Sequence, residues 1–243
     1  MLINRRNAMM ATSNSNKEEE MYKEMFLALV QGQASGTMTL KSDDVTSVRC
    51  RLLDCWKWIA NSSGGAVQSQ AVVTIDFPNC IEVGNNSFGN TFNDCNLASV
   101  NLPELVYLRG GSNFQRNICT EINLPKCVSF SNHEFSYSST LKTLRLPSVT
   151  SKSGSFFVYQ CSALENVYIE SMTLSQLGGA SYIAQQSCNS AAVFHLKDGD
   201  YDYQGNLISN GGGYKRKCVR RSQRRSWRPS ARFYAPRLWK EVA

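Results

Sequence analysis

The sequence predicts a mainly β fold, a solenoid in which a unit of about 22 residues is repeated along the chain. Similar segments recur at a nearly constant interval, each segment has the apolar–polar alternation of a short strand, and a proline follows most of these strands. A chain of 243 residues with 42% hydrophobic residues has enough apolar side chains to bury a core. The chain is therefore expected to fold, mostly as stacked coils.

Five segments align with one another. They read VVTIDFPNCIEV, LASVNLPELVYL, CTEINLPKCVSF, LKTLRLPSVTSK and, without the proline, LENVYIESM. The prolines at 78, 103, 125 and 147 follow one another at intervals of 25, 22 and 22 residues. Four columns accompany them: Val100, Ile122, Leu144 and Val167; Leu102, Leu124, Leu146 and Ile169; Cys80, Leu105, Cys127, Val149 and Met172; Phe88, Phe114, Phe135 and Phe156. Such regularity predicts a repeat fold.

The alternation within each segment predicts one short strand per coil. A period of two places every second side chain on the same face, so one face of each strand is buried. Proline lacks the N–H that a ladder needs and ends the strand. Because one coil cannot bury its own apolar face, about five to six coils are expected to stack.

The repeated pattern resembles the BspA-like leucine-rich repeats. Phe92, Cys95, Leu97, Val100 and Leu102, followed by a proline, match the pattern F-x-x-C-x-x-L-x-x-V/I-x-L-P after a one-residue deletion. The resemblance covers roughly residues 36–172. It implies a curved solenoid with a binding role, often at bacterial surfaces, but it does not imply a particular ligand.

The repeats are predicted to be flanked by other elements. Residues 1–35 are expected to contain a loose start and a helix over 17–31, with three glutamates in its first turn, which caps the first coil or anchors the chain. Residues 36–198 form the solenoid and its C-terminal cap, and 199–243 form a basic, flexible tail. The acidic residues Asp198, Asp200 and Asp202 have calcium-loop spacing, but Tyr203 and Ser209 replace the required glycine and glutamate, so a turn is predicted instead.

The net charge of +7 is concentrated in the tail. Residues 214–240 contain eleven Lys or Arg and no acid, whereas residues 1–213 carry 15 basic and 18 acidic side chains. With its aromatic residues, this segment suits weak binding to a polyanion, although a solvated tail without a partner is the alternative. The candidate binding residues are Lys215, Arg216, Lys217, Arg220, Arg221, Arg224 and Arg225.

No pattern in the sequence supports catalysis. The two histidines, His133 and His195, have no nucleophile at a recognisable spacing, and the common phosphate-loop, hydrolase and metalloprotease motifs are missing. The nine cysteines contain no C-x-x-C pair and are expected to be buried thiols. The sequence therefore predicts a protein that is not an enzyme and uses no cofactor or metal.

The polar positions of the strands are the predicted binding surface. They project from the face opposite the core, where they either contact a ligand or are merely solvated. These positions are Thr74, Asp76, Ser99, Asn101, Glu121, Asn123, Thr143, Arg145, Asn166 and Tyr168.

The predicted function is that of a recognition module of the surface or adhesion type, which binds a protein or a glycan. The alternative is a structural part of a larger assembly, such as a phage virion or surface particle. No signal peptide or apolar run of roughly 18 residues is recognisable, which favours a cytoplasmic or virion-associated location over classical secretion.

Overall fold

The computed structural model describes residues 37–48, 72–84 and 89–210. All of these residues lie within Met1–Gly213, the first of the two units into which the chain divides. The described residues of the first unit form the predicted solenoid, with a front sheet and a back sheet.

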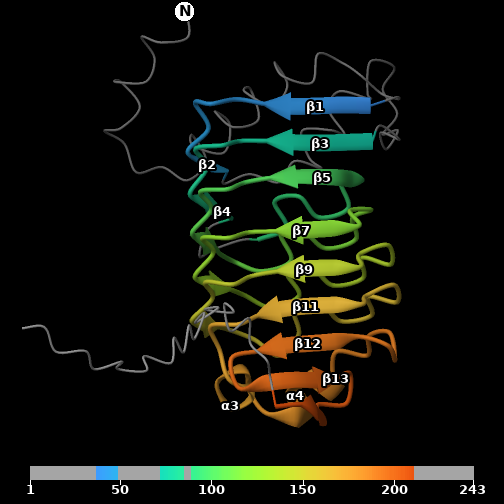
Figure 1. The fold of residues 1–243 in the computed structure, drawn as a ribbon. Coiled ribbons are helices and arrows are strands. Elements are labelled where there is room, and N and C mark those ends of the chain that lie inside the picture. Colours follow the sequence, from blue (N-terminus) through green and yellow to red (C-terminus); the bar gives the residue numbers. More distant parts are fainter. Residues whose placement is uncertain (1–36, 49–71, 85–88, 211–243) are drawn as a thin grey trace, which may run out of the picture. The chain divides into compact units, whose positions relative to one another are not determined.

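The front sheet contains the repeated strands, which lie one above another in Figure 1. Hydrogen bonds join them into a three-stranded group, β1-β3-β5, and a six-stranded group, β7-β9-β11-β12-β13-β14, and β5 lies beside β7. Seven strands run parallel: β1 (Thr37–Lys41), β3 (Val72–Asp76), β5 (Leu97–Asn101), β7 (Glu121–Asn123), β9 (Thr143–Arg145), β11 (Asn166–Ile169) and β12 (Val193–Leu196).

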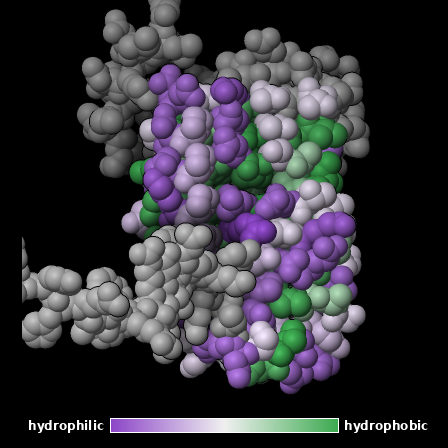
Figure 2. Space-filling view, in the orientation of Figure 1, coloured by the Kyte–Doolittle hydropathy of each residue, from purple (hydrophilic) through white to green (hydrophobic). Residues whose placement is uncertain are grey.

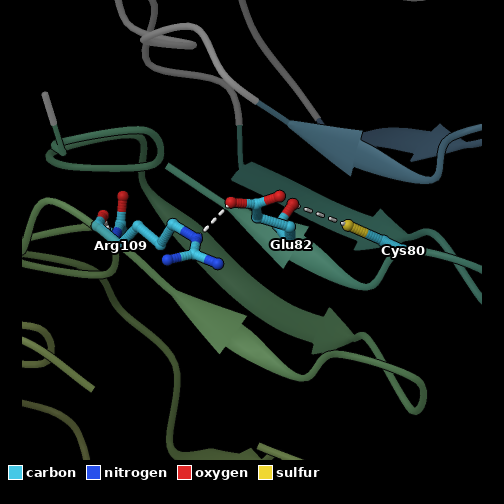
Figure 3. A network of polar contacts seen from close by, with 4 residues as sticks. Cys80, Glu82 and Arg109 are labelled. Carbon is cyan, nitrogen blue, oxygen red and sulfur yellow. Dashed lines mark hydrogen bonds and ion pairs between the residues drawn. The ribbon is translucent and has the colours of Figure 1, made fainter. Parts of the chain in front are cut away.

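A second strand in each of the first five coils forms the back sheet, so the prediction of one strand per coil is wrong. Two-residue strands are too short to show an alternation in the sequence. The five parallel strands are β2 (Ser47–Val48), β4 (Glu82–Val83), β6 (Tyr107–Leu108), β8 (Ser129–Phe130) and β10 (Ser151–Lys152). Figure 3 shows an ion pair between neighbouring coils, in which Arg109 donates to the carboxylate of Glu82.

The prolines end the front strands by beginning a β-turn. In each turn, the residue two positions after the proline donates its N–H to the carbonyl of the residue before the proline. Examples are Leu105 to Leu102 (3.2 Å) and Cys127 to Leu124 (3.2 Å). Proline is favoured at the second position of such turns because its φ is already fixed. The coil without proline makes the same bond, from Met172 to Ile169 (3.1 Å). The proline therefore favours the turn but is not required for it.

The apolar columns form one core between the two sheets. The column of Cys80, Leu105, Cys127, Val149 and Met172 is buried throughout, and so are the inward side chains of β7, β9 and β11. Val100 is only partly buried, and the register between β3 and β5 shifts nearby, between Val73 and Thr74. The column positions thus predict burial well, except where the repeat is irregular.

The predicted aromatic column is wrong at its last member. Phe92, Phe114 and Phe135 form a buried row, with ring centroids 5.5 and 5.8 Å apart. In the next coil Phe157 is buried and Phe156 is half-buried. Phe157 follows Phe135 by 22 residues, the usual period of the repeat, whereas Phe156 follows it by 21. Phe88 lies outside the described residues.

A row of polar side chains is buried where the chain returns from the back sheet to the front sheet. This polar row consists of Asn113, Asn117, Glu134 and Gln186. Each of them accepts hydrogen bonds from backbone N–H groups, either of turn residues or, for Asn117, of Leu97 at the start of β5; Asn113 Oδ1, for example, accepts from Thr91 (3.3 Å). The irregular backbone of these turns is satisfied in this way, as buried polar groups require.

Two short helices and a hairpin close the C-terminal end. Helix α3 (Leu174–Leu177) begins with a capping box of Thr173 and Gln176, and α4 (Ala180–Ala184) follows. The front sheet then continues past residue 198, where the sequence analysis ended the solenoid. Strand β13 (Gly199–Asp202) pairs antiparallel with β12, and β14 (Leu207–Ser209) pairs with β13. The predicted turn at Asp198 and Gly199 is thus a hairpin, which a repeat pattern does not reveal.

The predicted helix over 17–31 and the basic tail beyond residue 210 lie outside the described residues. Both stay predictions from the sequence.

Candidate binding surface on the front sheet

All ten predicted binding residues lie on one surface of the front sheet, which we call the strand face. None of them is buried, whereas the side chains between them point into the core. The register aligns them across neighbouring strands in two columns. Toward the N-terminus, Thr74 aligns with Ser99, and Asp76 aligns with Asn101. Toward the C-terminus, Glu121 aligns with Thr143 and Asn166, and Asn123 aligns with Arg145 and Tyr168. The sheet faces the viewer in Figure 1, and Figure 2 shows hydrophilic and hydrophobic side chains interspersed on this side.

The N-terminal part of the strand face carries small polar side chains and one ion pair. Lys41 Nζ lies 2.9 Å from Asp76 Oδ2, and Asn101 Nδ2 donates to Asp76 Oδ1 (2.6 Å). The hydrogen bond from Lys41, with a second from Asn101, holds the pKa of Asp76 below its ordinary value. Lys41 aligns with Asp76 in the parallel register.

The C-terminal part carries larger side chains, which stack on one another from strand to strand. Arg145 donates from Nε to Glu121 Oε1 (3.1 Å), and its guanidinium lies 4.1 Å from the centre of the Tyr168 ring. The other neighbour of Tyr168 is His195, whose ring is stacked on it at 4.3 Å with an interplanar angle of 12°. We call Arg145, Tyr168 and His195, together with Glu121 from the adjacent column, the stacked column. Four strands, from β7 to β12, hold it in place.

His195 also belongs to this surface, although it is not among the ten residues predicted from the sequence. Its Nδ1 lies 2.8 Å from Asp200 Oδ1 and its Nε2 lies 3.2 Å from Asn166 Oδ1. Burial alone would raise the pKa of Asp200, but hydrogen bonds from Ser209 and His195 lower it. The signal for His195 is available in the sequence, because Val-Phe-His-Leu at 193–196 has the same alternation as Asn-Val-Tyr-Ile at 166–169.

The repeat pattern identifies the family. A profile of the BspA-type leucine-rich repeat region, with six copies, matches residues 65–189. This chain belongs to the BspA-type leucine-rich repeat family. The match confirms the resemblance seen in the sequence. No curated protein and no solved structure matches the chain.

Leucine-rich repeats generally serve as protein-interaction folds. The family therefore supports a binding module built from repeats and does not specify the ligand. In the part of the chain that the structure describes, no helix is long and apolar enough to cross a membrane.

The three aspartates with calcium-loop spacing have separate roles. Asp198 accepts from the first N–H of α3, at Leu174 (3.0 Å), Asp200 contacts His195 and Ser209, and Asp202 accepts within its own hairpin, from the N–H of Asn206 (2.8 Å). The described residues contain no group of three or more acidic, histidine or cysteine side chains that could hold a metal.

The cysteines of the repeats are structural. The six in the described residues form no disulfide bond, and five of them are buried. Burial raises the pKa of Cys80, Cys119, Cys127 and Cys161 to about 12, which suppresses the reactive thiolate at neutral pH.

Proposed function

We propose that this protein is a non-catalytic recognition module, and that it binds a protein or glycan through the strand face. The stacked column is the observation that carries this proposal. Arginine and tyrosine are enriched among the residues that dominate binding energy at protein interfaces, and this column holds both on neighbouring rigid strands. A protein is thus the better fit of the two ligand classes.

The dimensions and rigidity of the strand face support this reading. Seven parallel strands at the usual spacing extend over about 30 Å, which suits a partner surface of standard size, about 800 Å² on each side. The side chains of the stacked column are already held by ion-pair, ring and hydrogen-bond contacts. Because these side chains are held in the unbound chain, binding costs less conformational entropy.

The contacts of His195 favour binding over catalysis. Both of its ring nitrogens have partners within the sheet, Asp200 and Asn166, and the latter is an amide rather than a nucleophile. A catalytic histidine must instead reach the atom whose proton it transfers.

An array of purified extracellular proteins and glycans tests the proposal. The native chain is compared with Tyr168→Ala and with Tyr107→Ser, which removes an exposed tyrosine from the back sheet. We expect at least one array component to bind the native chain and Tyr107→Ser equally, and to bind Tyr168→Ala at least about tenfold more weakly. Binding that is insensitive to Tyr168→Ala and to Arg145→Ala would place the ligand elsewhere on the molecule.

A further inference from the structure

Four aromatic rings gather on a second surface, formed by the turns that lead from the back sheet to the front sheet. This aromatic cluster consists of His133, Tyr137, Phe156 and Tyr159, all half-buried. The ring of His133 is stacked on that of Phe156 at 5.2 Å. Tyr159 lies edge-on to Tyr137 at 5.5 Å and tilted against Phe156 at 5.0 Å. The rings come from two neighbouring coils and form one continuous surface.

The repeat does not require aromatic residues at these positions. In each of three successive coils, two residues four positions apart lie in the left-handed region, and the φ values of these pairs lie between 56 and 61°. The residues are Asn90 and Asp94, then Ser112 and Arg116, then His133 and Tyr137. Asparagine, aspartate and histidine adopt this conformation more readily than other side chains, which cost roughly 1–2 kcal/mol there. Only the third of these coils places rings at both positions, so the backbone alone does not explain them.

The cluster combines an uncharged aromatic surface with polar atoms at its edges. Burial lowers the pKa of His133, which favours the neutral form of its ring. The hydroxyl of Tyr159 accepts from Gln160 Nε2 (3.2 Å), and Nδ1 of His133 lies 3.2 Å from the hydroxyl of Ser136. The guanidinium of Arg116 lies 5.0 Å from the centre of the Tyr137 ring. These groups offer hydrogen-bond donors and acceptors around the rings.

The size of the cluster favours a small ligand unit over a protein. Each aromatic ring buries about 150–250 Å² when it is fully covered, so four half-buried rings together expose at most a few hundred Å². A standard protein interface needs about 800 Å² from each partner. One or two sugar rings fit this area, and a pyranose presents an apolar C–H face bordered by hydroxyl groups.

We propose that the aromatic cluster is a second binding surface, and that it takes a neutral saccharide. The C–H face of a pyranose ring lies on the aromatic rings, and its hydroxyl groups hydrogen bond to the side chains at the edge. The surface is separate from the strand face, so it does not depend on the function proposed above.

The test measures binding of neutral hexasaccharides to the full chain. Cellohexaose, laminarihexaose, chitohexaose and mannohexaose are titrated by calorimetry, and saturation-transfer NMR reports which sugar protons contact the protein. We expect at least one of them to bind, with the strongest transfer to ring C–H protons. Tyr137→Asn and His133→Asn should each weaken binding about tenfold and leave the melting temperature nearly unchanged, since asparagine suits the left-handed backbone.

Two control variants locate the site. Tyr107→Asn removes another exposed tyrosine with an arginine over its ring, Arg109 at 4.7 Å, and should leave saccharide binding unchanged. Tyr168→Ala on the strand face should also leave it unchanged, which separates this proposal from the preceding one. If Tyr137→Asn lowers the melting temperature, saccharide binding by the His133→Asn variant is the deciding measurement.

Three results would overturn the proposal. The native chain could bind none of the four hexasaccharides, or both cluster variants could bind them as tightly as the native chain. In the third result, the native chain self-associates in sedimentation equilibrium and the cluster variants do not. The cluster would then be an interface between two copies of this chain.

Discussion

The coils bury side chains in two regions, and the two regions bury different kinds of side chain. One region is the front strand, which we call the strand edge. The other is the turn that returns the chain from the back sheet to the front sheet, which we call the turn edge. At the strand edge, the inward side chains are aliphatic, such as Ile122, Leu144 and Val167. At the turn edge, the chain buries the polar row, in which Asn113, Asn117, Glu134 and Gln186 bond to the backbone. The difference follows from the backbone. Strands satisfy their own N–H and C=O groups in a ladder, whereas irregular turns need side chains to do so.

The largest effect is expected at the strand edge. Leu124 is fully buried and Asn123, its neighbour in sequence, is exposed on the strand face. Leu124→Ala should lower the free energy of unfolding by about 2–5 kcal/mol, because it removes buried apolar surface and leaves a cavity. Asn123→Ala should change it by no more than about 0.5 kcal/mol. Urea unfolding measures both, and similar losses would mean that the two faces of the strand are reversed.

The two edges also differ in how far the sequence predicts them. Alternation with a period of two marked the inward residues of the front strands and the ten residues of the strand face, because each strand buries one side only. The polar row has no such signature. Glu134 and Asn117 lie in turns that are rich in polar residues. In such turns, the sequence does not distinguish a polar side chain that bonds to a buried backbone group from one that is exposed to solvent. The aromatic cluster was not predicted from the sequence either, because it depends on which turns of neighbouring coils meet.

Glu134 makes the turn edge sensitive to pH. It is the one carboxylic acid of the polar row, and Asn113 donates to its Oε2 from both the backbone N–H and Nδ2 (each 3.0 Å). Burial raises the pKa of Glu134 from 4.5 to about 7, although these hydrogen bonds favour the ionised form. As pH rises from 4.5 to 7, the unfolded chain loses this proton and the folded chain keeps it. The contribution of Glu134 to the stability of the fold should therefore be greatest below pH 4.5 and should be lost as pH rises through 7.

A comparison with Glu134→Gln isolates this contribution, because the amide has nearly the same shape and does not titrate. One pKa unit corresponds to about 1.4 kcal/mol, so between pH 5 and pH 8 the native chain should lose about 2–3 kcal/mol more stability than the variant. Denaturant titrations across this range measure the difference. Parallel curves for the two chains would show that Glu134 keeps an ordinary pKa in the fold.

The smallest of the expected effects is at Asn117, and this substitution tests the polar row most directly. Its Oδ1 accepts from the N–H of Leu97 (2.9 Å), and its Nδ2 donates to the carbonyl of Phe92 (2.8 Å), so one amide satisfies the backbone of the preceding coil. Asn117→Ala should cost about 1–3 kcal/mol, the usual penalty for leaving buried polar groups without partners. The matched change is Asn101→Ala on the strand face, where an exposed amide donates to Asp76 and its loss should cost no more than about 0.5 kcal/mol. Equal, small losses in urea unfolding would mean that water replaces the Asn117 amide, and that the turn edge is less dry than the strand edge.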